Sequence, residues 1–211
     1  MDLSELRKEY ATHGIDRAEL LACPLAQFKA WFAQAKSAGI NEPNAMVAST
    51  VDAAGAPTSR TVLLKAADET GFSFFTNYHS RKGDHLARDP RIALVFPWYT
   101  LERQIHLSGL VIKTSEEESA AYFARRPYGS QLGALASDQS QAIPDRQHLE
   151  VRLAELRAKY PEGQVPKPVN WGGYRVIPDQ FEFWQGRLNR LHDRFLYLKK
   201  GESWEISRLA P

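Results

Sequence analysis

Two groups of cationic side chains stand at the ends of β-rich segments in the first half of the chain. Arg60 and Lys65 enclose the apolar run TVLL, and Arg81 with Lys82 follow a segment that begins at Thr76 and is rich in polar side chains. Hydroxyls, Arg and Lys side chains and the backbone N–H groups of a helix N-terminus together form a phosphate-binding site. The alternative interpretation of Arg81 and Lys82 is a solvated surface pair, since most charged side chains are exposed.

A phenol, a guanidinium and a hydroxyl recur at short spacing in the middle of the chain. Tyr122 and Arg126 are four residues apart, which places two side chains on one face of a helix, and Ser130 follows the helix break expected at Pro127. Such a group suits a second phosphate. The alternative is a surface arginine beside a half-buried tyrosine.

A third group lies near the C-terminus. Arg190, His192 and Arg194 alternate along a segment expected to be a strand, so their side chains are expected on one face. Groups of like charge repel each other, and binding of an anion or an electron-rich ring would offset this repulsion. An isolated histidine is more often structural, but a histidine flanked by arginines has a pKa that is easily tuned for function.

Composition and missing motifs exclude several classes of protein. The 27 basic and 25 acidic residues give a net charge of +2, which argues against a nucleic-acid-coating protein. GxGxxG, P-loop, HExxH and GxSxG motifs are absent, and the six histidines lack ligand spacing, so no metal site is expected. Cys23 is the only cysteine, which excludes an intramolecular disulfide. Without a signal peptide or an apolar run of roughly 20 residues, we expect a soluble cytoplasmic protein that binds no membrane.

The elements that must position these groups are mostly strands. Short segments rich in β-branched and aromatic residues, separated by Gly, Asp and Pro turns, predict strands at 45–51, 59–66, 72–77, 91–99, 103–114, 174–185, 190–199 and 203–209. Helices are predicted from Pro24 to just before Gly39, and at 80–89, 115–126 and 145–160. Strands do not alternate with helices, so we expect a mainly antiparallel β fold with helical decorations rather than a Rossmann sheet. Residues 1–23 are expected to form an arm and 24–211 a single domain.

Six motifs, in order along nearly the whole chain, resemble the pyridoxamine 5′-phosphate oxidase family. They are RTVLLK, FFTNYHSRKG, FPWYTLERQI, YFARRPYGSQLGALASDQS, FWQGRLNRLHDRF and WEISRLAP. The resemblance implies an FMN-binding split β-barrel and a homodimer with FMN at the subunit interface. It also implies oxidation of pyridoxamine 5′-phosphate or pyridoxine 5′-phosphate to pyridoxal 5′-phosphate. The hydride would pass from substrate C4′ to flavin N5, and O2 would be reduced to H2O2.

The same resemblance assigns residues to ligands. It implies FMN binding by Arg60, Thr61, Val62, Leu63, Leu64, Lys65, Phe75, Thr76, Arg81, Lys82, Gln104, Gln139, Ser140, Trp184 and Arg194. It implies that the substrate phosphate is bound by Lys65, Tyr122, Arg126 and Ser130, while the catalytic pair Arg190 and His192 covers the substrate ring. The N-terminal segment with Arg7 and Tyr10 would be a lid that contacts substrate.

Two other functions fit parts of the pattern. One is another FMN-dependent oxidoreductase on the same barrel, such as a small flavin reductase. The other is a non-catalytic carrier of flavin or pyridoxal phosphate. The group Tyr122, Arg126, Ser130, Arg190 and His192 favours the vitamin B6 oxidase over the reductase, because these residues would hold its substrate.

Overall fold

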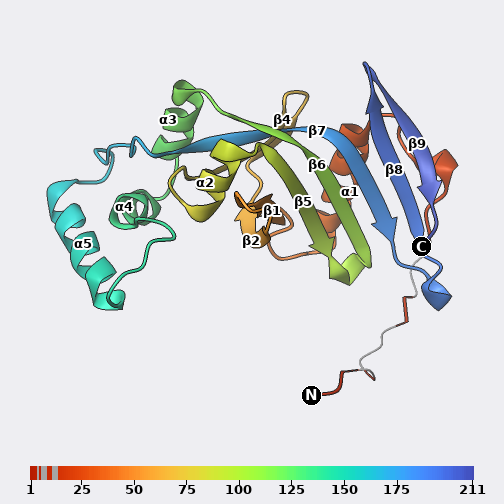
Figure 1. Cartoon of the computed structure of the whole chain (residues 1–211), viewed down its shortest axis with the longest axis horizontal. Coiled ribbons are helices and arrows are strands. Elements are labelled where there is room, and N and C mark those ends of the chain that lie inside the picture. The colour runs from red at the N-terminus through yellow and green to blue at the C-terminus, as the bar shows by residue number, and fades with distance from the viewer. Residues whose placement is uncertain (4, 6–8, 11–13) are drawn as a thin grey trace.

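A nine-stranded antiparallel sheet forms the body of the protein, and five α-helices pack around it in the part of the chain that the structure describes (Figure 1). The computed structural model describes residues 1–3, 5, 9–10 and 14–211. The strands are β1 (Ala45–Val51), β2 (Pro57–Leu63), β3 (Ala66–Asp68), β4 (Gly71–Asn77), β5 (Arg91–Trp98), β6 (Arg103–Lys113), β7 (Trp171–Gln185), β8 (Asp193–Lys200) and β9 (Ser203–Leu209). The helices are α1 (Pro24–Ser37), α2 (Arg81–Arg88), α3 (Glu116–Ala124), α4 (Tyr128–Ala136) and α5 (Arg146–Lys159).

The long strand β7 organises the sheet. One edge of β7 pairs with β6 along its length, while its other edge pairs first with β4 and then with β8. The order β2-β1-β5-β6-β7-β4-β3 therefore branches at β7 into a second arm, β8-β9. A register shift interrupts the β6–β7 pairing at Gly109, where a Cβ would lie 2.1 Å from the carbonyl oxygen of Ile177. A residue with a side chain does not fit this close approach of two backbones, and such a bulge bends the sheet.

A hydrophobic core lies between the sheet and helix α1. Alternate residues of β1 and β5 are buried, as expected when one face of a strand meets the core. Helix α1 covers this core. Phe28 packs edge-to-face on Phe72 and Phe96, and Trp31 packs edge-to-face on Phe183. The same core includes Ile15 and Leu20 of the segment before α1.

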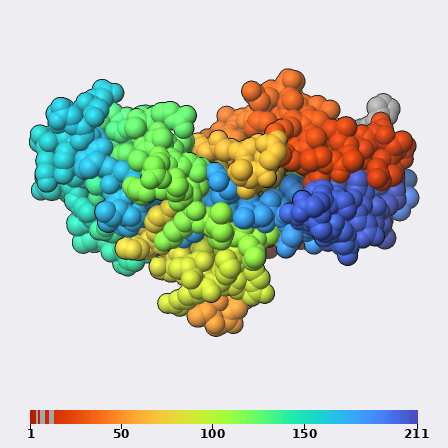
Figure 2. All heavy atoms as spheres, turned by 90° about the horizontal axis from the view of Figure 1, so that it is seen from above, coloured from red at the N-terminus to blue at the C-terminus, as the bar shows by residue number. Residues whose placement is uncertain are grey.

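The helices α3, α4 and α5 lie together at one end of the sheet, whereas β8 and β9 lie with the N-terminal segment at the opposite end (Figures 1 and 2). Ser115 caps α3 by accepting the N–H of Glu118. Helix α4 follows after a short break. Its Gln131 amide donates to the carbonyls of Phe123 and Ala124 at the end of α3. This side chain therefore satisfies backbone groups that a helix end leaves without partners.

The predicted antiparallel β fold with helical decorations is confirmed, and four local expectations were wrong. Helix α4 was not predicted, because its Gly129, Ser130 and Gly133 are weak helix formers and packing stabilises it instead. The strand predicted at 59–66 is divided into β2 and β3. Helix α3 ends at Ala124, so Arg126 lies beyond the helix that carries Tyr122.

The fourth difference concerns the cationic group near the C-terminus. β8 begins only at Asp193, and residues Leu188–Arg190 form a 3-10 turn. Asn189 and Arg190 have positive φ angles of 56° and 59°, a left-handed conformation that cannot continue a strand. Arg190, His192 and Arg194 therefore do not share one strand face. No helix in the described part of the chain is long and apolar enough to cross a membrane.

Candidate functional site

A cavity of about 1060 Å³ lies between the sheet and helices α2, α3 and α4. Strands β2 and β4, the N-terminus of α2 and the segment that joins α4 to α5 all contribute to its wall. Fourteen of the residues that the sequence assigned to a cofactor or substrate line it: Arg60, Thr61, Val62, Leu63, Lys65, Phe75, Thr76, Arg81, Lys82, Tyr122, Arg126, Ser130, Gln139 and Ser140. Tertiary structure thus brings together the first two cationic groups and the Tyr122 group, which are far apart in the sequence.

The wall of this cavity carries positive charge without compensating carboxylates. Among the residues that the structure describes, the six cationic residues that line it are Arg60, Lys65, Arg81, Lys82, Arg125 and Arg126, and no Asp or Glu lines it. Among the described residues, none of these six has a carboxylate partner within 4.0 Å. Like charges in one cavity repel each other unless an anion joins them. The cavity is therefore built for a ligand with several negative charges.

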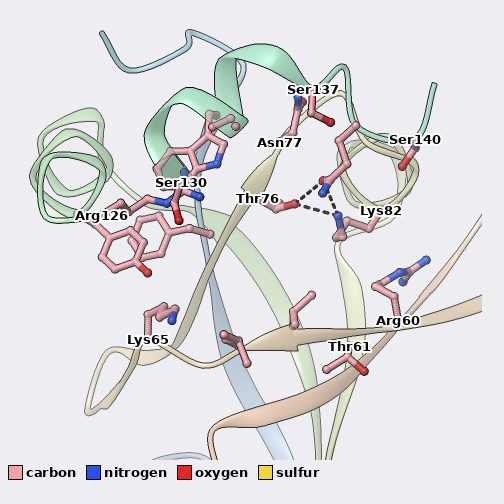
Figure 3. A pocket seen from close by; sticks show the side chains of 18 of the residues that line it. Arg60, Thr61, Lys65, Thr76, Asn77, Lys82, Arg126, Ser130, Ser137 and Ser140 are labelled. Carbon is pink, nitrogen blue, oxygen red and sulfur yellow. Dashed lines mark hydrogen bonds between the residues drawn. The ribbon is translucent and has the colours of Figure 1, made fainter. Parts of the chain in front are cut away.

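Lys82 marks one end of the cavity. Its buried ammonium donates to Thr76 Oγ1 at 2.8 Å (Figure 3) and to Gln139 Oε1 at 2.9 Å. It also donates to Ser80 Oγ at 3.1 Å. These acceptors are neutral, so the charge of Lys82 stays available to an anion. Burial, together with the nearby charge of Arg60, lowers the pKa of Lys82 to about 8. The N-terminus of α2 lies here as well, and Ser80 caps it by accepting the N–H of Gly83.

Arg60 is also held by neutral oxygens. Its Nη1 donates to the carbonyl of Ala48 at 3.0 Å and to Thr50 Oγ1 at 2.8 Å, and its Nη2 donates to Thr58 Oγ1. The Thr50 hydroxyl in turn lies 3.1 Å from Nδ1 of the buried His85 on α2. Burial lowers the pKa of Arg60, and the charge of Arg81 adds to this effect. The guanidinium is therefore fixed in direction while its charge remains unpaired.

Arg126 marks the other end of the cavity, and in the view of Figure 3 it lies with Ser130 and Lys65 on the side away from Lys82. Its guanidinium carbon is 4.8 Å from the centre of the Trp171 ring. Its Nη1 is buried and has no hydrogen-bond partner among the described residues. Burial lowers the pKa of Arg126. A buried guanidinium nitrogen without an acceptor is costly, which indicates that a ligand oxygen completes this site.

Several lining residues were not identified from the sequence. They are Thr58, Ser59, Asn77, Arg125, Pro127, Gly133, Ala134, Ser137 and Trp171. Arg125 directly precedes Arg126, so its cationic side chain could have been included in the predicted phosphate site. Trp171 lies 45 residues beyond Arg126, and no spacing rule connects the two.

A second group of predicted residues lies away from the cavity, around the ends of β6, β7 and β8. Gln104 pairs with Trp184 across β6 and β7, and Trp184 pairs with Arg194 across β7 and β8. The rings of Tyr10 and His192 pack on Trp184 with centroid distances of 5.7 Å and 4.7 Å. None of these five residues, nor Arg190, lines the cavity of the same chain. The structure thus divides the predicted site into two parts.

His192 and Arg194 of this second group already have partners within the chain. The backbone N–H of Arg187 donates to His192 Nδ1 at 3.1 Å, and burial together with the charge of Arg190 lowers the pKa of His192. Arg194 forms a bidentate ion pair with Glu182, with hydrogen bonds of 2.7 Å and 3.1 Å, and this pair raises the pKa of Arg194. Arg194 is therefore already paired with a carboxylate, unlike the arginines of the cavity.

Three further expectations concern single residues or metals. Leu64 is buried in the hydrophobic core rather than lining the cavity. Arg7 lies outside the described residues. Within the described part of the chain, no group of three His, Cys, Asp or Glu side chains could hold a metal ion.

Comparison with known proteins gives a consistent result over the chain. A family model described as pyridoxamine 5′-phosphate oxidase matches residues 32–160, and one described as pyridoxine 5′-phosphate oxidase C-terminal dimerisation region matches residues 171–211. The chain is 52% identical to the pyridoxine/pyridoxamine 5′-phosphate oxidase of Paraburkholderia phytofirmans, over 99% of each chain. It is 51% identical to the protein of the same name from Streptomyces avermitilis, over all of this chain and 96% of the relative.

Solved structures agree with these sequence matches. PhzG from Burkholderia lata, crystallised with tetrahydrophenazine-1-carboxylic acid, superposes with a TM-score of 0.87 at 31% identity, over 92% of this chain and 95% of PhzG. A pyridoxamine 5′-phosphate oxidase-related, FMN-binding protein from Nostoc punctiforme shares the fold, with a TM-score of 0.71 at 16% identity, over 91% of this chain and all of that chain. The split-barrel fold expected from the motifs is confirmed. Two family models and relatives more than 50% identical over the full length place this chain in the pyridoxamine 5′-phosphate oxidase family.

Proposed function

We propose that this protein uses FMN to oxidise pyridoxamine 5′-phosphate and pyridoxine 5′-phosphate to pyridoxal 5′-phosphate. The observation that carries the proposal is the cavity itself: its described lining has six cations, no carboxylate and a cationic group at each end. A cavity of about 1060 Å³ is large enough for a flavin and a small aromatic substrate together. One phosphate for each ligand accounts for the two ends.

The Lys82 end fits the phosphate of FMN. Arg60, Arg81 and Lys82 supply charge, and the N-terminus of α2 supplies hydrogen-bond donors. The backbone of β2 lies along the same wall and would face the isoalloxazine ring. Bound FMN would supply two-electron oxidation, accepting the hydride of substrate C4′ at N5 and passing the two electrons to O2, which would be reduced to H2O2. The alcohol substrate then needs no further reactant, whereas the amine substrate takes up one water and releases ammonia.

The Arg126 end fits the phosphate of the substrate. Arg126 has a buried nitrogen that finds no acceptor in the described part of the chain, and Lys65, Tyr122 and Ser130 line the same cavity. Binding a dianion here satisfies the unpaired nitrogen and offsets the repulsion among the cations. Because the phosphate is remote from the reacting carbon, its binding energy serves to orient the substrate. An unphosphorylated vitamer should therefore react poorly.

A homodimer would complete the site. The second group, with Trp184, Arg190, His192 and Arg194, lies within the region that matches the dimerisation model, and it does not line the cavity of its own chain. We infer that each subunit places this group over the FMN of its partner. Such a shared site needs a two-fold arrangement in which both copies contribute equally.

His192 and Arg190 would position the substrate ring. His192 Nδ1 already accepts the N–H of Arg187, so the neutral ring carries its proton on Nε2 and can donate it to a substrate oxygen. The lowered pKa of His192 favours the neutral ring. Arg190 adds a positive charge beside the reacting carbon. Holding the reactants in this way lowers the entropic part of the barrier.

Anaerobic reduction tests the proposal. The purified protein should be yellow, should release FMN on denaturation, should bleach with pyridoxine 5′-phosphate in the absence of air, and should recover its colour when air is admitted. Pyridoxine without phosphate should bleach it slowly. An Arg126→Ala variant should need much more substrate for bleaching, whereas Arg157→Ala, on the exposed helix α5, should behave as wild type. A protein that does not bind FMN, or that pyridoxine 5′-phosphate cannot bleach, would refute the proposal.

Mixed dimers test whether the site is shared. Arg126→Ala removes a cavity residue and Arg190→Ala removes a residue of the second group, so each homodimer has two defective sites. When equal amounts of the two variants exchange subunits, about half of all dimers are heterodimers. If the two groups come from different subunits, each heterodimer has one intact site out of two, so about a quarter of the wild-type activity returns at low substrate concentration. If the mixture is no more active than the separate variants, each site is built from one chain.

A further inference from the structure

Trp171, the first residue of β7, lies behind the cationic end of the cavity that contains Arg126. The indole is 6% exposed and lines the cavity. Its ring stacks in a nearly parallel arrangement with Tyr122, at 6.1 Å and 6°, and with Phe75, at 5.6 Å and 15°. Phe123 adds an edge-on contact at 5.1 Å. The ring is therefore held firmly by aromatic neighbours.

The guanidinium of Arg126 lies over this ring. Its Cζ is 4.8 Å from the ring centre, within the range of a cation–π interaction. Nη1 has no hydrogen-bond partner among the described residues, and no carboxylate there forms an ion pair with the group. The guanidinium also lies 5.7 Å from the centre of the Phe123 ring, so the shorter contact with Trp171 is the main constraint on the direction of this half-buried cation.

The backbone of Trp171 is itself anchored. Lys167 Nζ donates to the Trp171 carbonyl at 2.9 Å and to the Pro168 carbonyl at 3.1 Å, and it lies 3.1 Å from a Glu116 carboxylate oxygen at the start of α3. Trp171 also pairs with Asn77 at the end of β4. The ring therefore has a fixed position relative to both α3 and the sheet before any ligand arrives.

We propose that Trp171 is a positioning residue that holds Arg126 toward the phosphate monoester of the substrate. This inference rests on the proposed function, because it deepens the role of the same cavity. Trp171 acts through Arg126 and does not need to touch the ligand. A guanidinium constrained in advance loses less conformational entropy on binding than a freely rotating one, so the indole raises the affinity for phosphate.

Two substitutions separate the aromatic face from simple space filling. Trp171→Phe keeps a ring beneath Arg126, whereas Trp171→Leu removes it. Trp204→Leu is the matched control, since Trp204, on β9, lies outside the cavity and packs edge-on against Phe181 of β7. Each variant is purified as holoenzyme, and its FMN content and Tm are measured first.

Substrate kinetics and phosphate binding then give two independent readouts. With Trp171→Leu, the KM for pyridoxine 5′-phosphate should rise by about 2- to 30-fold, the range expected from a cation–π interaction, while kcat and FMN content stay near wild type. Trp171→Phe should recover most of the loss, and Trp204→Leu should leave KM unchanged. Inorganic phosphate should raise the Tm of the wild-type holoenzyme and should raise that of the Trp171→Leu variant less.

The outcomes distinguish this inference from the proposed function. If wild type binds no FMN and oxidises no substrate, the proposed function fails, and the phosphate-dependent Tm still reports on Trp171 and Arg126. If wild type is an oxidase but the Trp171→Leu variant keeps its KM and its response to phosphate, Trp171 has no positioning role. A loss that Trp171→Phe does not recover, or a loss of kcat and FMN together, would also overturn the inference, because either pattern indicates a structural defect.

Discussion

Replacing Lys82 by methionine removes a buried charge at the proposed FMN phosphate site while it retains most of the side-chain volume. In wild type the ammonium has three neutral oxygen acceptors and no carboxylate partner among the described residues. Its position is therefore unfavourable for the protein alone and favourable for a bound dianion. The substitution should separate stability from FMN affinity.

The two contributions to stability nearly cancel. A pKa of about 8 in place of 10.5 corresponds to roughly 3 kcal/mol of unfavourable free energy for charged Lys82, or about 2 kcal/mol after allowance for solvent screening. The variant gains this amount, but it also loses hydrogen bonds to Thr76, Ser80 and Gln139 at a net cost of about 1 kcal/mol each. We therefore expect the free energy of unfolding of the apoprotein to change by no more than about 1 kcal/mol. FMN affinity should fall by about 30-fold or more, the equivalent of at least 2 kcal/mol for a lost buried charge pair.

FMN affinity and the stability of the apoprotein should both depend on pH through the protonation of Lys82. Below pH 8 Lys82 is charged in the folded apoprotein and attracts phosphate, and above pH 8 the folded apoprotein loses this proton. FMN affinity of the wild-type apoprotein should therefore decline as the pH rises through about 8. Between pH 8 and 10.5 the unfolded chain still holds the proton, so this group contributes a rise in apoprotein stability with pH. Lys82→Met should lack both trends.

Quenching of FMN fluorescence by the apoprotein measures affinity, and urea unfolding measures stability. Lys36→Met, on an exposed position of α1, is the control and should match wild type in both assays. The reasoning is refuted if Lys82→Met binds FMN within about threefold of wild type, a difference below 1 kcal/mol. It is equally refuted if the decline above pH 8 persists in the variant.

Two further substitutions probe the second group and the segment that supports it. Arg190→Ala should lower kcat more than FMN content, as measured by turnover and by flavin absorbance, and a selective loss of flavin would assign Arg190 to the cofactor instead. Asp193→Ala should lower the free energy of urea unfolding by about 2–3 kcal/mol, because Arg187, Arg208 and the N–H of Ile15 all lose their shared carboxylate. Glu205→Ala, which removes only an exposed contact of 3.9 Å with Lys200, should change it by less than about 0.5 kcal/mol, and equal effects of the two would contradict this account.

Local patterns in the sequence were sufficient for most of the sheet. The strands predicted at 45–51 and 203–209 coincide with β1 and β9, because alternation of side chains and flanking turn residues act over a few neighbouring positions. The cationic groups at Arg60–Lys65 and Arg81–Lys82 were identified from spacing for the same reason. The long motifs added the family, which the comparisons confirm.

Local patterns failed where distant packing or backbone conformation decides the structure. Helix α4 contains weak helix formers and is stabilised by contacts such as those of Gln131 with the end of α3. The left-handed conformation of Asn189 and Arg190 moves Arg190 and His192 out of the strand that alternation predicted. Helix and strand propensities summed over neighbouring residues do not predict either feature, since both depend on contacts with distant parts of the fold.

The sequence by itself determined the strands, the charged groups and the family, because these depend on residue types at short spacing. Only the tertiary structure decided which charges share one cavity, that no carboxylate stands among the described residues that line it, and that Trp171 lies against Arg126. It also decided that Trp184 and His192 lie apart from that cavity in the same chain. These relations join residues tens of positions apart, and their distances are set by how the sheet curls and how helices pack on it, which no local spacing encodes.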